Sequence, residues 1–476
     1  MQLCLTLAER SIEALNRKVR QYDGQVDLIE IRLDYLDQLH LPSLPISPQS
    51  SYVATCRPQR EGGMYGGEEL ARFKLLRRAA EHGFDWVDLE HDVVFPEILT
   101  TGIRIIRSRH IFDAFPIDLD SELLTLKGGD LQKLAIKVHN TVEMVRLLKW
   151  TESSKHLVGR HIVIGMDDPG QPTRYLAPFL GSEWTYVCEE TSIPSAPGQF
   201  SLKEGRQLGK AFPSAPLYGV IGKPVRHSLS PALVNGLFRH YGFSGSYIRL
   251  PLDTLDPWFQ YVEKSSLDFH GFSVTLPFKT DVIRFCQKYD SPVGAINTLC
   301  ARGDNWKGLN TDYTAFLSPL LSRLSLKGAS VVVIGNGGVA HTVVSALLGQ
   351  GARVTITGRN KDRLARFARQ FKCPSVLLQH LNSHADLLVN TTPVGQHPNI
   401  DSSPLTKSQL DFDVVYDLVY NPEKTRLLKQ AKEQGAQTIT GMEMFVEQAA
   451  LQFRAWTGTN PNRIIMRDLI HEELGK

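Results

Sequence analysis

The sequence has few cysteines and no long hydrophobic run. Its six cysteines are scattered over 476 residues without a CxxC pair, which is typical of free thiols in a reducing compartment and not of a disulfide framework. No apolar stretch approaches the roughly 20 residues that a membrane-spanning helix needs. The first segment, MQLCLTLAER, meets a glutamate and an arginine too early for a secretory signal peptide. We therefore expect a cytoplasmic protein.

A large excess of either charge is also missing. The 53 basic and 50 acidic residues leave a formal net charge of +3, and no basic run occurs. Neither nucleic acid nor an anionic membrane is expected as a partner, because both are bound by clustered positive charge. Small anionic substrates need only a few local arginines. No histidine and carboxylate cluster has metal-ligand spacing, so no metal site is expected. The oligomeric state is not predicted.

The chain is too long for a single hydrophobic core, and two or three domains are expected. Its content of 42% hydrophobic and 22% charged residues is that of an ordinary globular protein. A segment rich in Gly, Pro, Ala and Ser near residue 210 is typical of a connector. We predict a first domain at 1–210, a linker at 211–216, a lobe at 217–324 completed by 436–476, and a further lobe at 325–435.

Short apolar segments alternate with amphipathic ones in the first domain. Eight such segments within about 200 residues predict a (β/α)8 barrel, whose active site lies at the C-terminal ends of the strands. The expected strands are Gln2–Thr6, Val26–Ile31, Tyr52–Thr55, Trp86–Leu89, Arg104–Arg107, Leu134–Val138, Ile162–Ile164 and Thr185–Val187.

Charged side chains end several of these strands. Each one alone could be a solvated surface group, but acids, arginines and a histidine at one end of a barrel predict an anion-binding acid–base site. A loop rich in Ser, Pro and Gly, Ser192–Gln199, could close over a ligand. The charged residues are Glu30, Arg32, Arg57, Glu90, His110 and, further along the chain, Arg174.

The sixth strand carries two lysines, Lys133 and Lys137, on one face. A lysine that is desolvated inside a barrel can form a Schiff base with a ketone. The barrel rule favours Lys137, which lies nearer the C-terminal end of the strand. The residues alone do not decide between the two.

A dinucleotide site is predicted around the segment Val331–Ala340, VVVIGNGGVA. A buried strand there runs into a glycine-rich turn and a helix, so a phosphate can approach the helix N-terminus closely. The next strand is followed by Arg359, and Arg363 lies four residues further on. An arginine at this place suits the 2′-phosphate of NADP, whereas NAD sites usually have an acidic residue. The turn residues are Gly335, Asn336, Gly337, Gly338 and Val339.

Polar residues also follow apolar strands on both sides of this segment. Ser228 and Ser230 offer hydroxyls for a carboxylate or a polyol, although serines that cap a helix are about as common. Lys279 and Asp312 could protonate a carbonyl oxygen as hydride reaches its carbon; Lys–Asp pairs are more often structural. Further candidates are Asn297, which follows an apolar strand, and Thr391, at the C-terminal end of another.

The first domain resembles the type I 3-dehydroquinate dehydratases. The similarity rests on EIR at Glu30–Arg32, Arg57 before EGG, DLE at Asp88–Glu90, His110, Lys133 before Leu-Ala, Arg174, and SAPGQ at Ser195–Gln199. It implies that Lys133 forms the Schiff base, that His110 is the acid–base group and that Glu90 orients it. Substrate contacts are implied for Glu30, Arg32, Arg57, Arg174, Ser195 and Gln199. Ile111 stands where many members have an acidic residue.

The remainder of the chain resembles the shikimate dehydrogenases. The shared motifs are SLSP, SVTLPFK, INT, NTD, GNGGVA, GR with Arg363, VNTTPVG, DLVY and GxxMxxxQ. The resemblance implies a catalytic pair, Lys279 and Asp312, and NADP held by the glycine turn, Arg359, Arg363, Thr391 and Gly441. Ser273 stands where many members have asparagine. Substrate contacts are implied for Ser228, Ser230, Thr275, Asn297, Tyr420 and Gln448.

The whole chain is thus similar to the bifunctional enzymes that combine these two families. The expected fold is α/β, an N-terminal (β/α)8 barrel followed by a two-lobed dehydrogenase with a Rossmann-like NADP domain. The expected substrates are 3-dehydroquinate, 3-dehydroshikimate and shikimate, and the retained SLS serines favour shikimate over quinate. Two alternatives are a Schiff-base aldolase fused to a quinate dehydrogenase, and a non-enzymatic sensor of quinate-like ligands.

Overall fold

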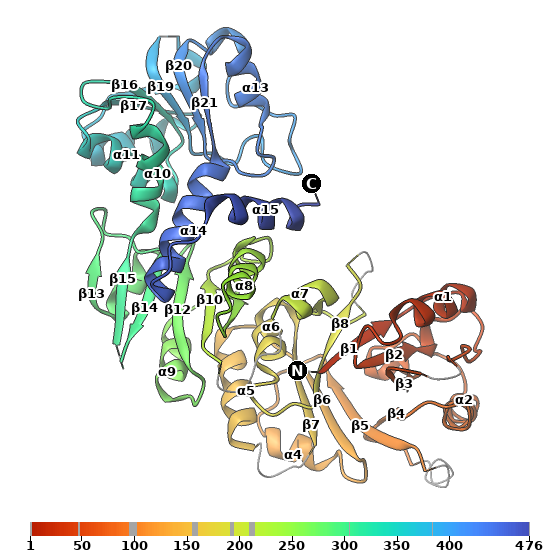
Figure 1. Ribbon diagram of the computed structural model, residues 1–476. Helices are drawn as coiled ribbons and strands as arrows, with labels where there is room; N and C mark the ends of the chain where they lie inside the picture. Colours follow the sequence, from red (N-terminus) through yellow and green to blue (C-terminus); the bar gives the residue numbers. More distant parts are fainter. Residues whose placement is uncertain are drawn as a thin grey trace. The chain divides into compact units, whose positions relative to one another are not determined.

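A computed structural model describes residues 2–45, 48–94, 102–154, 160–190, 195–208, 215–303, 305–382 and 384–475 (Figure 1). Most of the expected linker, residues 211–214, and the start of the loop expected at 192–199 lie outside the described residues. Contacts divide the chain into two compact units, residues 1–270 and 271–476. Among the described residues, no helix has the length and apolar character that crossing a lipid bilayer requires.

The first unit is built on a parallel sheet whose strands follow the chain order. Each strand pairs with its neighbour in sequence from β1 to β7, and β8 pairs with β1, as in a (β/α)8 barrel. The strands are β1 (Gln2–Leu7), β2 (Leu28–Arg32), β3 (Ser51–Thr55), β4 (Trp86–Glu90), β5 (Arg104–Ile111), β6 (Leu131–Lys137), β7 (His161–Met166), β8 (Trp184–Cys188) and the short β9 (Phe200–Ser201). The helices are α1 (Ile12–Tyr22), α2 (Glu69–Glu81), α4 (Leu119–Leu124), α5 (Thr141–Ser154), α6 (Asp167–Leu176) and α7 (Leu202–Gln207).

The interior of the barrel is layered along its axis. All eight strands β1–β8 contribute side chains to one apolar cluster, which includes Cys4, Leu28, Val53, Trp86, Ile106, Leu131, Ile162 and Trp184. Successive inward positions on a strand are two residues apart. On β4, Trp86 joins the apolar cluster, while Asp88 and Glu90 are buried further along. An apolar floor thus lies beneath a polar layer at the C-terminal ends, where the barrel rule places the active site.

Four further elements complete the first unit. Strand β10 (Leu217–Ile221) pairs in parallel with β11 (Ser246–Leu250), and helix α8 (Ser230–Tyr241) lies between them in the chain. Helix α9 (Asp256–Lys264) follows. Helix α8 ends at Gly242, whose φ of 69° is in the left-handed region that glycine adopts without cost.

The second unit opens with an antiparallel region. Strand β12 (Phe269–Val274) pairs with β14 (Thr298–Arg302), and β14 pairs with β15 (Asn305–Leu309). Strand β13 (Cys286–Asp290) runs parallel to β15. Helix α10 (Thr311–Leu321) then leads into the second sheet. At the end of the chain, α14 (Gly441–Thr457) and α15 (Arg463–Glu473) follow that sheet.

The second sheet is parallel and doubly wound. Its strand order, β18-β17-β16-β19-β20-β21, is the 3-2-1-4-5-6 order of Rossmann domains. On β16, Val331 and Val333 pack into one core and Val332 and Ile334 into the other, which explains the unbroken apolar run. The elements are β16 (Ser330–Ile334), α11 (Gly338–Gly349), β17 (Arg353–Gly358), α12 (Lys361–Phe371), β18 (Ser375–Leu377), β19 (Ala385–Asn390), β20 (Phe412–Asp417), α13 (Arg426–Glu433) and β21 (Gln437–Thr440).

Candidate active sites

A cavity lies at the C-terminal ends of the barrel strands. Its lining draws on β1, β2, β5, β6, β7 and β8, on helix α6, and on the segment that precedes β9. The structure therefore brings together residues that the sequence spreads over much of the first unit. Of the residues predicted for this site, those that line the cavity are Glu30, Arg32, Arg57, His110, Lys133, Arg174, Ser195 and Gln199.

The two lysines of β6 differ in how deeply they are buried. The Lys133 side chain is 6% exposed, and its Nζ lies 3.0 Å from Asp88 Oδ2 and 3.7 Å from Glu30 Oε1. Nζ also lies 4.4 Å from the centre of the Tyr186 ring, a distance at which the ring attracts a cation. The Lys137 side chain is 41% exposed, and only Asp167, at 4.0 Å, pairs with it among the described residues. Lys133 is therefore the amine inside the cavity.

A dense network of charges lies beneath Lys133. Arg57 pairs with Asp88 at 2.7 Å and with Glu90 at 2.9 Å. Burial tends to raise the pKa of Asp88, but the positive charges of Arg57 and Lys133 outweigh it and hold that pKa well below its usual range. Asp88 is thus an anion at any pH near neutrality, and it keeps a countercharge beside the amine.

The second reactive group is His110 at the end of β5. Its Nδ1 lies 3.0 Å from Glu61 Oε2, and the same oxygen accepts a 2.7 Å hydrogen bond from the backbone N–H of His110. Burial, together with the positive charges of Arg57 and Lys133, lowers the pKa of His110 well below its ordinary value. Its imidazole is therefore neutral at physiological pH. Because an oxygen that accepts the backbone N–H faces Nδ1, the ring proton belongs on Nδ1 and the lone pair on Nε2.

The predicted role of Glu90 as the group that orients His110 is wrong. Glu90 Oε1 accepts a hydrogen bond from Arg57, and Oε2 accepts one of 2.7 Å from Arg72. Both arginines are buried, so the two oxygens of Glu90 are needed to neutralise them. Glu61 takes the orienting position instead, from the 3-10 turn Gln59–Glu61 that follows β3. Burial raises the pKa of Glu61 to about 7.

The cavity also holds a site for an anion. Arg174 is buried; one of its nitrogens donates to Pro197 O at 3.2 Å, while Nε has no hydrogen-bond partner among the described residues. Burial lowers the pKa of Arg174 to about 10, so the guanidinium remains charged at neutral pH. A buried charged donor without a partner is costly unless a ligand supplies an acceptor. Ser195 and Gln199 hydrogen-bond to each other at 3.2 Å beside it.

The predicted serines lie at the start of helix α8 in the first unit. Ser230 is its first residue, and its backbone N–H donates to Ser228 Oγ at 3.3 Å. Ser228 is partly exposed, whereas Ser230 is buried, with 9% of its surface exposed. Both readings of these serines, as helix capping and as ligand binding, are compatible with this geometry.

The Lys–Asp pair of the second unit is formed as expected. Lys279 Nζ lies 2.6 Å from Asp312 Oδ2. Asp312 is in the first turn of α10, and Asn297 precedes β14. Asn297 hydrogen-bonds through its amide to Thr311, the neighbour of Asp312. Thr275, the residue after β12, lies in the turn that leads to Lys279, where its carbonyl accepts the N–H of Phe278.

The glycine turn after β16 has the geometry of a dinucleotide site. Gly335 has a φ of 115°, and a Cβ there would lie 2.4 Å from Thr391 Oγ1. Gly337 is the N-cap of helix α11 and Gly338 is its first residue. The backbone N–H groups of Gly338 and Val339 therefore lie in the first helical turn, where they have no acceptor within the helix. Arg359 and Arg363 are both exposed beyond β17. Asn336 completes this turn, at the C-terminal edge of the sheet.

Three further predicted residues surround the start of helix α14. The Tyr420 ring stacks on Phe445 with centres 4.9 Å apart. Gln448 Nε2 donates to the backbone oxygen of Phe445 at 3.1 Å. Gly441 is the first residue of the helix, and a Cβ there would lie 2.4 Å from Leu418 O. Gly441 is therefore required by a close backbone contact, whatever it binds.

Comparisons with known proteins match successive parts of the chain to a dehydratase family and then to shikimate dehydrogenase families. The type I 3-dehydroquinase family matches residues 3–212, and the shikimate dehydrogenase substrate-binding family matches residues 220–299. The shikimate/quinate 5-dehydrogenase family matches 320–407, and the C-terminal domain family of shikimate 5′-dehydrogenases matches 441–471. A chloroplastic bifunctional 3-dehydroquinate dehydratase/shikimate dehydrogenase of Arabidopsis thaliana is 33% identical over 473 residues, covering 91% of this chain and 78% of the relative. This chain belongs to that bifunctional family.

Other relatives match the dehydrogenase part alone. The NADP(+)-dependent shikimate dehydrogenase of Bacillus licheniformis is 32% identical, covering 55% of this chain and 98% of the relative. A solved structure of the Thermus thermophilus shikimate 5-dehydrogenase with NADP(H) and shikimate is 33% identical, with a TM-score of 0.48, and covers 54% of this chain and 98% of that one.

Two residues of the dehydratase site were missed by sequence reasoning. Glu61 was recognised only as part of the EGG motif, because nothing in the sequence shows that the turn after β3 reaches His110. Arg72 is fully buried on α2 and donates to both Cys56 O and Glu90 Oε2. An arginine on the inward face of an amphipathic helix was the available signal.

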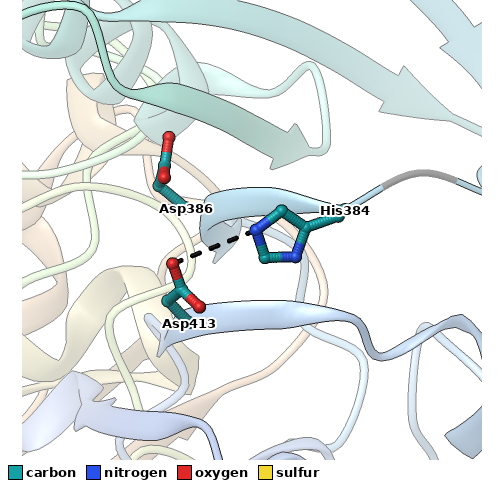
Figure 2. A group of neighbouring side chains, drawn as sticks. All are labelled: His384, Asp386 and Asp413. Carbon is teal, nitrogen blue, oxygen red and sulfur yellow. Dashed lines mark ion pairs between the residues drawn. The ribbon is translucent and has the colours of Figure 1, made fainter.

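The structure also brings together one group of metal-ligating type that sequence spacing did not suggest. Figure 2 shows His384, Asp386 and Asp413 beside one another, and their ligand atoms lie within 4.8 Å of one another. The Asp386 carboxylate accepts two 2.6 Å hydrogen bonds from Ser330, and His384 Nδ1 lies 3.1 Å from Asp411. The group is at the N-terminal edge of β19 and β20, the edge opposite the glycine turn. His384 also forms an ion pair with Asp413, whose Oδ2 lies 4.0 Å from Nε2.

Proposed function

We propose that this chain catalyses two consecutive reactions, the dehydration of 3-dehydroquinate to 3-dehydroshikimate and the NADPH-dependent reduction of that product to shikimate. The first reaction takes place in the barrel and the second in the dehydrogenase part. The observation that carries the proposal is a single cavity holding a buried amine, Lys133, and a neutral imidazole, His110, oriented by Glu61. We assign the dehydratase to residues 1–210, the linker to 211–216, the substrate lobe to 217–324 with 436–476, and the NADP lobe to 325–435.

Dehydration begins with the Lys133 amine. In its neutral form the amine attacks the C3 carbonyl, and loss of water from the adduct leaves an iminium ion. The carboxylates of Asp88 and Glu30 and the face of Tyr186 surround this positive charge. The iminium withdraws electrons from C2, so that the C2 proton becomes acidic.

His110 then moves the proton. Its Nε2 removes the proton from C2, and the electron pair forms the C2=C3 bond of an enamine. The enamine returns the pair, the C1–O bond breaks, and the hydroxyl leaves as water with the proton that His110 carried. Hydrolysis of the conjugated iminium releases 3-dehydroshikimate and restores the amine. A neutral base with a fixed tautomer is what the low pKa of His110 and the Glu61 contact provide.

The other residues of the cavity hold the substrate. Arg174, with its unpartnered Nε, is suited to the carboxylate. Arg57 and Arg32 supply further positive charge, although Asp34 pairs with Arg32 at 2.8 Å. Glu30, Ser195 and Gln199 offer acceptors and donors to the ring hydroxyls.

In the dehydrogenase part, Lys279 and Asp312 are the acid–base pair. The Lys279 ammonium donates a proton to the C3 carbonyl oxygen during reduction, and Asp312 holds that ammonium at 2.6 Å. Bound NADPH supplies the hydride. Substrate contacts are assigned to Ser228, Ser230, Thr275, Asn297, Tyr420 and Gln448.

The residues of the glycine turn fit NADP. A Cβ at Gly335 would collide with Thr391 Oγ1, so glycine lets the turn lie close to the end of β19, whereas the Cβ position of Gly337 is open and leaves room for a phosphate at the start of α11. Arg359 and Arg363 provide two positive charges at the end of β17, where a 2′-phosphate lies in NADP sites. Thr391, whose N–H and hydroxyl both donate to Ile334 O, fixes the floor of the turn.

Variants of the two halves test this assignment. With K133A, formation of the conjugated product from 3-dehydroquinate should be lost, while oxidation of shikimate with NADP+ is retained. With D312N the reverse is expected. An aldolase would instead break a carbon–carbon bond, and a sensor would release no product, so NMR of the products separates both alternatives. If K133A retains dehydration, or the wild type produces neither compound, the proposal is wrong.

A further inference from the structure

A buried glutamine connects helix α14 to the substrate side of the dehydrogenase. Gln452 is 3% exposed and lies one turn beyond Gln448, on the same face of the helix. Its Oε1 accepts a 2.8 Å hydrogen bond from Ser273 Oγ on β12. Its Nε2 donates to Asn297 O and to Thr298 Oγ1, both at 3.0 Å. The side chain therefore meets three separate groups around Asn297.

These contacts determine the direction of the next hydrogen bonds. Thr298 Oγ1 accepts from Gln452, so its hydroxyl proton is directed to Asn297 Oδ1, 2.9 Å away. The same Oδ1 accepts the backbone N–H of Thr311 at 2.8 Å. The Thr298 hydroxyl and the Thr311 N–H thus occupy the amide oxygen of Asn297, with the Thr311 hydroxyl also 3.2 Å away, and the amide nitrogen must lie on the other side.

The amide nitrogen of Asn297 is left as a donor beside the catalytic pair. It gives one hydrogen to Thr311 Oγ1 at 2.9 Å, and Thr311 precedes Asp312. Ile296, on the other side of Asn297, donates its N–H to Lys279 O at 2.6 Å. Asn297 is thereby attached to both members of the Lys279–Asp312 pair through adjacent residues.

We propose that Gln452 is a positioning residue for shikimate binding: through Thr298 it fixes the Asn297 amide so that its nitrogen donates toward the hydroxy acid. The inference rests on the proposed function, because it takes Asn297 as a substrate contact. Both ends of the Gln452 amide are engaged, the oxygen by Ser273 and the nitrogen by Asn297 O and Thr298 Oγ1, so the effect of Gln452 on the Asn297 side chain passes through Thr298.

The helix does not depend on Gln452 for its place. Trp456, one turn further on, donates its indole N–H to Leu299 O at 2.9 Å, and Gly271 makes room for that ring. Phe453 and Ala450 are also fully buried. A substitution that keeps the volume of residue 452 should therefore leave α14 docked.

The test is Q452M, because methionine is similar in length to glutamine and has no hydrogen-bonding amide. Q452M removes all three hydrogen bonds of the amide, and loss of the one to Thr298, which orders Asn297, is expected to raise KM for shikimate about 5- to 10-fold. KM for NADP+ and the dehydratase activity of the same chain should not change. R454M, an exposed position two residues further along α14, is the matched control and should leave all three values at the wild-type level. A merely structural role would instead lower thermal stability and kcat without a selective effect on KM for shikimate.

A double-mutant cycle with T298V tests whether Gln452 acts on Asn297 through Thr298. If Gln452 acts through Thr298, T298V raises the same KM, and Q452M/T298V is no worse than T298V alone. Additive effects, or a KM for shikimate within twofold of wild type in Q452M, would overturn the inference and leave the proposed function intact. If Q452M does not fold, T298V alone still decides, because an unchanged KM there contradicts the route. A wild type that does not oxidise shikimate removes both proposals.

Discussion

At the scale of single residues, burial assigns different roles to side chains of the same type. Lys133 and Lys137 are four residues apart on one strand, yet one lies between carboxylates in a cavity and the other is largely in solvent. Glu61 and Glu90 differ in a similar way, since Glu90 neutralises two buried arginines and Glu61 contacts an imidazole. Side-chain chemistry at this site is therefore decided by neighbours from other strands.

Borohydride trapping tests the assignment of the amine. In the presence of 3-dehydroquinate the reagent should reduce the iminium and leave a covalent adduct on Lys133, located by peptide mass spectrometry. K133A should lower dehydratase kcat by at least about 10³-fold, because the covalent route is lost. K137A is the matched control and should retain both the adduct and the activity. An adduct on Lys137 would contradict the assignment.

The pH dependence of stability tests the environment of Glu61. Its pKa is raised to about 7 from an ordinary value of 4.5, so between these pH values the folded protein holds a proton that the unfolded chain releases. The contribution of Glu61 to the free energy of unfolding therefore falls as the pH rises through this window. E61Q, which cannot ionise, should gain on the order of 3 kcal/mol relative to wild type between pH 5 and pH 8.

Urea unfolding of both proteins at these two pH values measures the difference. Equal stability differences at pH 5 and pH 8 would show that Glu61 titrates normally. The dehydrogenase activity of E61Q serves as a control for folding of the rest of the chain.

Sequence reasoning reached most of the dehydratase cavity but not its internal pairing. The residue types and their places at strand ends indicated an anion-binding acid–base site. The choice between Lys133 and Lys137 was made only through resemblance, because the residues alone do not say how far along β6 the cavity lies. Glu61 was missed for a related reason: it reaches His110 across a turn, and such contacts have no periodicity.

At the scale of elements, the short apolar segments located the barrel strands, but some strands are longer than the segments that predicted them. Each of the eight segments expected in the barrel overlaps one of β1–β8, and the (β/α)8 and Rossmann-like classes are confirmed. Strand β5 was expected to end at Arg107 but continues to Ile111, and β6 begins at Leu131 and not at Leu134. In both, polar residues interrupt the apolar pattern without ending the strand: His110 and Lys133 line the cavity, and Ser108 is buried against Asp88 and Arg57.

The turn between β17 and α12 carries the prediction for cofactor choice. R359A removes a charge at the place expected for the 2′-phosphate and should raise KM for NADP+ about 10-fold or more, since hydrogen bonds to charged groups are the strong ones. KM for NAD+ should change little, because NAD+ lacks this phosphate. R369A, at the other end of α12, is the matched control. Steady-state kinetics with each cofactor measure KM for NADP+ and KM for NAD+. A similar increase in both values would contradict the assignment.

At the scale of the whole molecule, one chain carries two independent sets of reactive groups. The dehydratase set lies within the first unit, and the Lys279–Asp312 pair and the glycine turn lie within the second. Each set can be disabled without altering residues of the other. This separation lets each activity serve as the folding control for variants of the other.

The measurement that tests the account most directly follows both steps in one sample. Purified full-length chain is given 3-dehydroquinate and NADPH, and the oxidised cofactor and the products are quantified together. The account predicts one NADPH oxidised for each shikimate formed, and accumulation of 3-dehydroshikimate when NADPH is omitted. A folded preparation that leaves 3-dehydroquinate unchanged, or consumes it without oxidising NADPH, would contradict the account.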